Sequence, residues 1–244
     1  MTTARQRGVA TLGVLAAIAL AAGPAHGQIR PPRMPGRTGP SPEVARLLSR
    51  IDTTRALFDR ATFLLYQAAG VMEAAVATQE RRAEIRRELA SADSIERRGG
   101  DNRVQLNAED RATGLEQATA ARRYEQAQLS DVQARNVTNV GFNAAVALLM
   151  DGFALNEARQ LIGEAQRAAQ SIGSDPAQLA HANRLRAAAT EDLPAIVNAV
   201  PQQQRLGSAI RAAVAQARAA NQAVQVSEAT ARSDAPRPID FASL

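Results

Sequence analysis

The 244-residue chain contains no cysteine, no lysine and no tryptophan. Without cysteine, disulfides, thiolate metal ligands, thiol catalysis and covalent haem attachment are excluded. Aromatic residues make up only 3% of the chain, so any core must consist mainly of Leu, Ile, Val and Ala. No stretch of useful length shows the apolar–polar alternation that is typical of a half-buried strand. We therefore predict an all-α fold.

Acidic residues are missing from the first 42 positions, whereas five of the 29 arginines lie there. From residue 43 onward, 24 arginines face 24 acidic residues, so this region is neutral although the whole chain carries a net charge of +5. A protein that binds nucleic acid concentrates its positive charge on a folded surface. We therefore expect no nucleic-acid partner.

Residues 1–27 have the order that is typical of a secretory signal peptide. Two arginines precede an apolar run over residues 8–22, and small residues at Ala25 and Gly27 precede a cleavage point before Gln28. The run is shorter than the roughly 18 residues expected of a membrane-spanning helix, which favours cleavage over an uncleaved N-terminal anchor. Cleavage after Ala25 is the alternative. The sequence predicts an exported protein, periplasmic or secreted, with no stable membrane span after cleavage.

Residues 28–42 hold five prolines, two glycines and three arginines, a composition that predicts an extended Pro/Arg-rich linker. Ser41, Pro42 and Glu43 then form a helix start, with serine as the N-cap and proline at the first helical position. We expect a helical bundle domain over residues 43–232 and a loosely ordered C-terminal tail over residues 233–244.

An apolar residue recurs every three or four positions from Val44, which predicts a helix with a coiled-coil-like seam. The seam positions are Val44, Leu47, Ile51, Thr54, Phe58, Ala61, Leu65, Ala68, Met72 and Ala75. The pattern continues more weakly through Ile85 and Leu89 and stops before Gly99. Whether residues 42–98 form one helix is left open, with Gly70 as a possible flexible point.

A second helix is expected to start at Asn107, to break or kink at residues 136–139, and to continue through the most apolar part of the chain as far as Ile172. A further helix begins near Asp175, and Pro194 and Pro201 are expected to divide this part of the chain into short pieces. The last helix is expected over residues 202–230. These elements predict an elongated antiparallel helical hairpin or bundle with coiled-coil-like packing.

Motifs for metal, cofactor or nucleotide binding are missing. A carboxylate-bridged di-metal bundle needs Glu-x-x-His on two helices, but His181 is the single histidine after the predicted signal peptide and Gln178 precedes it by three positions. We expect no catalytic, cofactor-binding or metal-binding residues. Asp151, in the most apolar helix, has two interpretations: a carboxylate with a perturbed pKa in a pocket, or, as we prefer, a surface residue paired with an arginine or water. Glu157 is a similar candidate.

The charged segment over residues 79–98 is the strongest candidate for an interaction surface. On a helix, Glu80, Glu84 and Glu88 form an acidic row, and Arg82 and Arg86 form a basic row. Its partner can be the chain's own second helix or a second copy of the chain. An ordinary solvated face is the simpler interpretation.

These features favour a non-enzymatic bundle of the cell envelope with a structural or partner-binding role, acting through helical surfaces or self-association. The alternative is a carrier of an apolar small ligand or lipid, held between large apolar residues of two helices. The candidate residues for this carrier site are Phe142, Met150 and Phe153, with Phe58, Phe63 and Tyr66 opposite.

Overall fold

A computed structural model of the chain describes residues 39–97, 106–173, 175–226 and 228–244. The predicted signal peptide, and the linker as far as residue 38, lie outside these ranges. Residues 37–244 form one structural unit. Its described part is helical and contains no strand, which confirms the predicted all-α fold.

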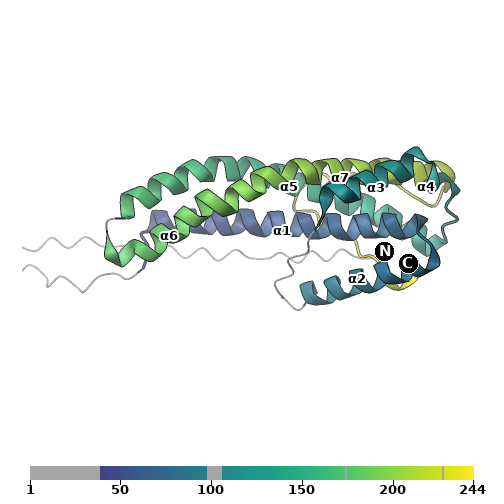
Figure 1. Cartoon of the computed structure of the whole chain (residues 1–244), viewed down its shortest axis with the longest axis horizontal. Coiled ribbons are helices and arrows are strands. Elements are labelled where there is room, and N and C mark those ends of the chain that lie inside the picture. The colour runs from purple at the N-terminus through teal and green to yellow at the C-terminus, as the bar shows by residue number, and fades with distance from the viewer. Residues whose placement is uncertain (1–38, 98–105, 174, 227) are drawn as a thin grey trace, which may run out of the picture. The chain divides into compact units, whose positions relative to one another are not determined.

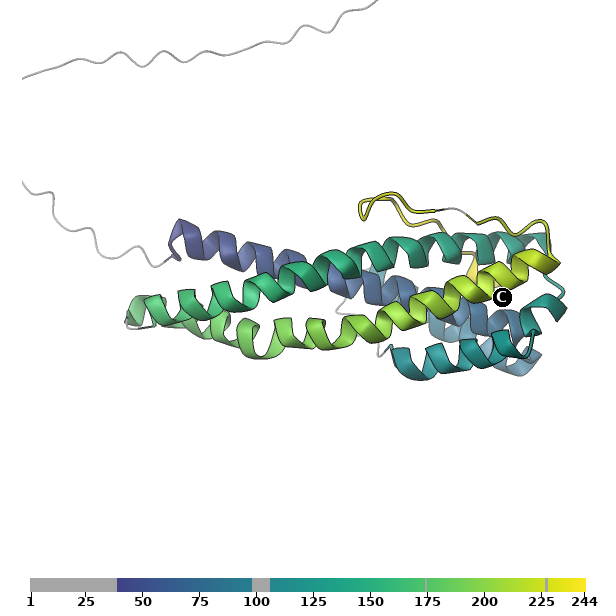
Figure 2. The same ribbon diagram turned by 90° about the horizontal axis from the view of Figure 1, so that it is seen from above.

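Three long helices run side by side through this unit, and shorter helices flank them (Figures 1 and 2). The described helices are α1 (Pro42–Val76), α2 (Gln79–Arg97), α3 (Ala108–Ala120), α4 (Arg123–Gln126), α5 (Asp131–Ile172), α6 (Leu179–Ala187) and α7 (Leu193–Ala220). α1 packs on α5, α5 packs on α7, α3 lies on α7, and α2 folds back against α1. The bundle is therefore built mainly from contacts between elements far apart in the sequence.

α1 begins as the sequence predicts. The Ser41 hydroxyl accepts a hydrogen bond from the backbone N–H of Val44 at 3.3 Å, and Pro42 occupies the first turn. Every predicted seam position is at least partly buried: Phe58 and Ala75 are half-buried and pack against the core, and the others are buried. The seam faces α5 and α7 rather than a single partner helix.

α1 and α2 are separate helices, so the single-helix alternative for residues 42–98 is wrong. α1 ends at Val76, and the Arg82 guanidinium donates to the backbone carbonyls of Ala74 and Ala77 at 3.1 and 3.3 Å. Gly70 is a packing point rather than a flexible one, because a Cβ there would lie 2.9 Å from Leu89 on α2. The small glycine lets α2 approach α1 closely.

The expected break at residues 136–139 is also wrong, because α5 is continuous from Asp131 to Ile172. The chain breaks earlier, between Ala120 and Asp131, where Arg122 has a φ of 54°. Ser130 and Gln133 form a capping box that starts α5. α5 is also the one described helix that is long and apolar enough to cross a membrane, but 61% of its apolar window is buried in the bundle.

The prolines do not divide the chain after residue 192 as expected. α7 runs unbroken through Pro201, and Pro194 lies in its first turn, where a missing N–H is tolerated. A π-helical turn at Ala188–Asp192 connects α6 to α7. The apolar residues that α7 buries include Leu206, Ile210, Val214 and Ala217. The helix ends at Ala220 rather than near residue 230.

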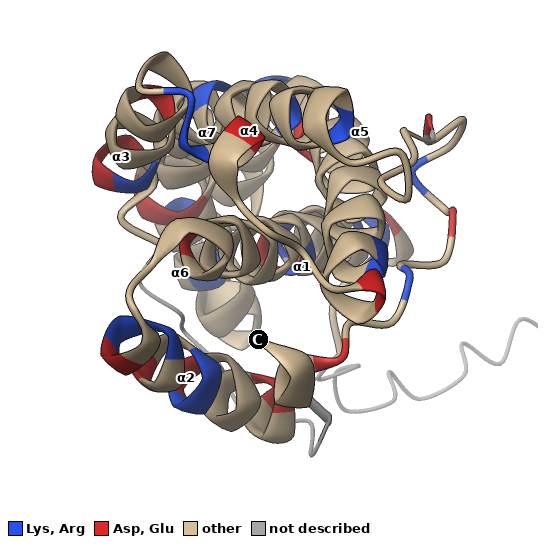
Figure 3. Ribbon diagram, turned by 90° about the vertical axis from the view of Figure 1, so that its right-hand side faces the viewer, with Lys and Arg blue, Asp and Glu red and all other residues tan. Residues whose placement is uncertain are grey.

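The apolar core consists of two clusters along the bundle. One contains Leu65, Met72 and Leu206, and the other contains Ile51, Leu161 and Leu193. Between them lie polar side chains from three helices: Thr62 on α1, Asp151 on α5 and Gln203 on α7. Most charged residues lie on the outer sides of the helices (Figure 3), and Asp151 is the one acidic or basic residue that is buried within the described ranges.

Candidate partner-binding groove

A groove with a volume of about 690 Å³ lies between α5, α7 and the segment that follows α7. Its lining residues are Gly141, Ala145, Leu148, Leu149, Ser208, Arg211, Ala212, Val214, Ala215, Gln225, Val226, Glu228 and Ala229. Small residues on both helices leave space for the groove, and the segment after α7 forms one wall. We call this feature the α5–α7 groove.

Exposed apolar side chains are concentrated in this groove. Leu149 is 40% exposed and Val226 is 51% exposed, and both line it. Leu179 is the third large apolar residue with comparable exposure in the described ranges, at 47%, and it lies on α6, away from the groove. Clustered exposed apolar side chains are typical of interaction sites, whereas single ones are common on any surface.

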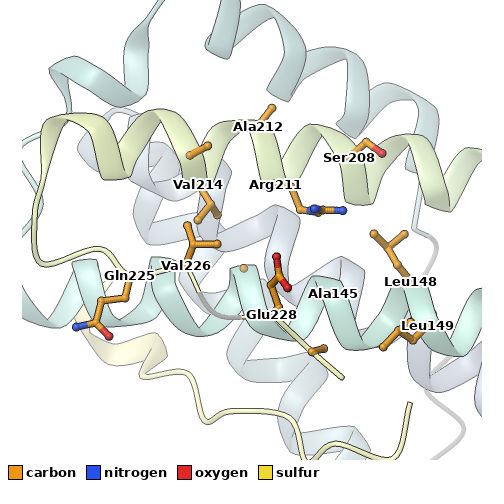
Figure 4. Close-up of a pocket in the computed structure, with 13 residues that line it drawn as sticks. Ala145, Leu148, Leu149, Ser208, Arg211, Ala212, Val214, Gln225, Val226 and Glu228 are labelled. Atoms are coloured by element: carbon orange, nitrogen blue, oxygen red, sulfur yellow. The ribbon is translucent and has the colours of Figure 1, made fainter. Parts of the chain in front are cut away.

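Two opposite charges lie among the apolar side chains of the groove, between Val226 and Leu149 (Figure 4). Arg211 extends from α7 and Glu228 extends from the opposite wall, while Val214 and Val226 face each other between the two backbones (Figure 4). Neither Arg211 nor Glu228 forms an ion pair with another described residue. Arg205, six residues earlier on the same helix, donates to both carboxylate oxygens of Glu116 at 2.9 and 2.7 Å. The groove therefore offers charges that are available to a ligand.

Asp151 is fully buried, so the preferred interpretation of a surface residue paired with arginine or water is wrong. Burial in the apolar core raises its pKa from 3.8 to about 8. Asp151 is not among the residues that line the α5–α7 groove. It has the perturbed pKa of the alternative interpretation, but it lies in the core rather than in that groove.

The Gln203 amide lies between Asp151 and Thr62 and can bond to both in either of two orientations. With Nε2 toward Asp151, it donates to both carboxylate oxygens at 3.0 Å, and Oε1 accepts from the Thr62 hydroxyl at 2.8 Å. In the reversed orientation, Nε2 donates to Thr62 Oγ1 at 2.8 Å, and Oε1 faces the Asp151 carboxyl. The first arrangement suits an ionised carboxylate and the second a protonated one, which can donate to Oε1.

The structure does not bring the predicted carrier residues together in a ligand site. Phe142, Phe63 and Met150 are buried. The Arg237 guanidinium lies 4.1 Å from the centre of the Phe142 ring, and that of Arg232 lies 3.3 Å from the Phe153 ring. None of the six predicted residues lines the α5–α7 groove. The sequence pattern identified the apolar helix, but it did not identify which side chains of that helix are exposed in the groove.

The charged segment of α2 pairs mostly within itself and with α1. Arg81 lies 2.9 Å from Glu84 and 3.7 Å from Glu88, which are exposed pairs on the same helix. Arg82 serves as a cap for α1 instead of forming part of a basic row. Exposed ion pairs of this kind contribute little to binding or stability, so α2 has the character of a solvated face.

A second hollow of about 440 Å³ lies between α1, α2, α3 and α4. Glu73 and Arg111 form an ion pair of 2.9 Å there, and burial still raises the pKa of Glu73. Tyr124 is buried, and its hydroxyl has no hydrogen-bond partner among the described residues. The charges in its lining are mixed and largely compensate one another, so this hollow selects no ligand charge.

Metal ligands do not gather anywhere in the part of the chain that the structure describes. His181 is half-buried on α6, and Glu157 forms an ion pair with Arg50 at 2.7 Å. No family model, curated protein or solved structure matches the chain. Its surfaces therefore have to be interpreted from their own chemistry.

Proposed function

We propose that the chain is an exported, non-enzymatic helical bundle that binds a protein partner in the cell envelope through the α5–α7 groove. The observation that carries this proposal is the exposure of Leu149 and Val226 in one groove that also holds Arg211 and Glu228, neither of which forms an ion pair with another described residue. Apolar contact supplies most binding energy at such sites, and nearby charges orient the partner.

The chemistry of the groove defines its partner. Apolar side chains of the partner pack against Leu149 and Val226, where they replace water on these exposed surfaces. An acidic residue of the partner pairs with Arg211, and a basic residue pairs with Glu228. The expected partner is therefore a protein segment that has apolar residues next to charged residues of both signs.

Export is supported by the composition of residues 1–27 and by the Pro/Arg-rich linker that comes after them. A protein purified from the periplasmic or secreted fraction is expected to have the mass of a chain that begins at Gln28, or at His26 for the alternative cleavage. An intact Met1 found only in membranes would contradict export.

The alternative function is a carrier of an apolar small ligand. The groove volume of about 690 Å³ falls in the range of small-molecule sites, roughly 300–1,000 Å³. Native mass spectrometry separates the two functions. A non-protein adduct that persists in the wild type and disappears in Leu149→Glu would favour the carrier.

Site-specific photo-crosslinking in the producing cell tests partner binding. A photoreactive amino acid is placed at position 149, 226 or 179 in separate variants. Positions 149 and 226 are expected to yield an adduct with the same protein, identified by mass spectrometry. Position 179 is the matched control, because Leu179 is equally exposed but lies outside the groove.

Charge reversal provides a second control. Arg211→Glu is expected to reduce the yield of the adduct at position 149 at least severalfold, because both charged residues of the groove are then acidic and an acidic residue of the partner is repelled. Arg205→Glu, on the same helix but outside the groove, is expected to leave it unchanged. Equal adducts at all three positions, or no effect of Arg211→Glu, would refute the proposed site.

A further inference from the structure

A row of amide side chains on α5 holds the C-terminal tail, on a face that is separate from the α5–α7 groove. Gln133, Asn136, Asn139 and Asn143 recur every three or four positions, so they lie along one side of the helix. We call these four residues the amide face and residues 235–244 the tail. The tail runs antiparallel to α5, as Figure 2 shows for this end of the chain.

The amide face binds the backbone of the tail at successive points. Asn143 donates to the carbonyl of Arg237 at 2.9 Å and accepts from its N–H at 2.7 Å. Asn136 forms the same pair of bonds with Asp240, at 2.8 and 3.0 Å. Asn139 donates to the carbonyl of Pro238 at 2.7 Å. Asn143 and Asn136 thus each bond to both the N–H and the carbonyl of one tail residue, as a neighbouring strand would.

Side-chain contacts add specificity to these backbone bonds. The Arg237 guanidinium stacks over Phe142, a contact that favours a cation at this place in the ligand. At the end of the tail, Leu244 is buried beside Val71 and Val137, between α1 and α5. The site therefore fits an extended segment with Arg-Pro followed by a C-terminal apolar residue.

The expectation of a loosely ordered tail does not agree with these contacts, yet the contacts are of a kind that can be released. A permanently buried helix face is normally apolar, because an amide without a partner in the core costs free energy. The amide face is compatible with water when the tail leaves. Val224 is buried and the Gln225 N–H donates to the Thr138 hydroxyl at 2.9 Å, so the connection to the tail starts after this point. Residues 226–234 can extend to about 30 Å at about 3.3 Å per residue, which is far enough to reach a neighbouring molecule.

We propose that the amide face is an exchangeable peptide-docking site that accepts the tail of a second copy of this chain. The tail is the sequence that the structure shows to fit, so a second copy presents the same backbone path, the same arginine and the same terminal leucine. The closed monomer and the exchanged dimer contain the same contacts between the tail and the amide face. Their ratio depends on protein concentration relative to the effective concentration of the tail in its own chain, on the order of millimolar for a short flexible connection.

Disulfide trapping in the full-length protein tests this exchange, and the chain has no cysteine of its own that can interfere. Asn139→Cys and Pro238→Cys are made in separate chains, which are mixed and oxidised. Neither chain can form the disulfide alone, so trapped heterodimer accumulates even when exchanged molecules are a minority. The expected result is a 139–238 disulfide that forms at least fivefold faster than in the control pair.

The control pair is Gln160→Cys with Pro238→Cys, because Gln160 is exposed on α5 outside the amide face. The double variant Asn139→Cys/Pro238→Cys must form its disulfide within one chain, which verifies the docked geometry. The proposal would be overturned if the heterodimer with cysteine at position 139 formed no faster than the heterodimer with cysteine at position 160. It would also be overturned if the double variant formed no disulfide within one chain.

Discussion

Asp151 lies where the two apolar clusters of the bundle meet, and its proton couples the stability of the fold to pH. The carboxyl titrates near pH 8 in the folded protein and near pH 3.8 when unfolded. Between these values the folded state holds a proton that the unfolded state has lost. The free energy of unfolding must therefore decrease as the pH rises through this window, by up to about 1.4 kcal/mol per unit.

Asp151→Asn is expected to remove this dependence. Asparagine is neutral and can donate to Gln203 Oε1, so it reproduces the protonated arrangement at every pH. Denaturant unfolding between pH 5 and pH 9 is expected to give a flatter slope and a more stable protein at pH 8 than the wild type. Gln203→Met, which keeps the titrating carboxyl, is expected to lower stability without flattening the slope. Equal slopes for the wild type and Asp151→Asn would show that Asp151 does not titrate in this window.

The sequence alone could not place Asp151 in the core. Its neighbours in the chain, Met150 and Gly152, are compatible with burial or exposure, and its polar partners belong to other helices. Gln203 is buried on α7 and Thr62 lies on α1. An acid without a local partner is more often exposed than buried, and only the packing of three helices reverses this expectation.

At the scale of elements, glycines decide how closely helices approach. Gly152 and Gly163 of α5 do not mark close contacts, because nothing lies within 4 Å of a Cβ built at either position. The close approaches are at other glycines. A Cβ on Gly207 of α7 would lie 2.6 Å from Cδ2 and 2.8 Å from Cγ of Leu148 on α5, so the α5–α7 contact next to the groove depends on Gly207.

The pair Gly207→Ala and Gly152→Ala tests this distinction. Alanine at position 152 is expected to raise the free energy of unfolding by up to about 1 kcal/mol, because it favours the helix and contacts nothing. At position 207 the same gain is opposed by overpacking against Leu148, which costs about 1–3 kcal/mol. Urea unfolding of both variants measures the difference. A Gly207→Ala protein as stable as Gly152→Ala would mean that Leu148 moves aside without cost.

Helix starts were more predictable than helix ends. The Ser41 cap agrees with the sequence pattern, since a capping side chain acts locally. A helix also starts after Asn107 as expected, although the Asn107 side chain forms no capping hydrogen bond. Pro201 was expected to end a helix and does not, and the amide-rich residues 136–139 were expected to break one and instead bind the tail. In both places, contacts with distant parts of the chain override the local preference.

For the whole molecule, the periodicity of α1 was sufficient to predict an all-helical bundle, because the seam positions repeat over many turns. The partners of each helix could not be predicted, since Ala-rich faces are similar to one another. The groove was missed for the same reason. Leu149 belongs to the apolar pattern of α5, and its exposure depends on where the chain runs after Ala220.

The tail completes the bundle, and Asn143 is the residue that tests its contribution. Asn143→Ala removes both bonds to the backbone of Arg237 and leaves those groups without partners, which is expected to cost about 1–3 kcal/mol. Hydrogen exchange followed by mass spectrometry is expected to show faster exchange at Arg237 and Asp240, whose N–H groups donate to Asn143 and Asn136. The amides of α7 are expected to keep their protection.

Asn139→Ala is the matched control, because Asn139 donates a single hydrogen bond and is more exposed than Asn143. Its effect on exchange in the tail is expected to be smaller. If Asn143→Ala left the exchange at Arg237 unchanged, the tail would be held by Leu244 and the arginine–aromatic contacts alone. If protection were lost throughout α7 as well, the tail would be part of the cooperative core instead of a separately releasable segment. Faster exchange confined to the tail is the result that a docked but exchangeable segment requires.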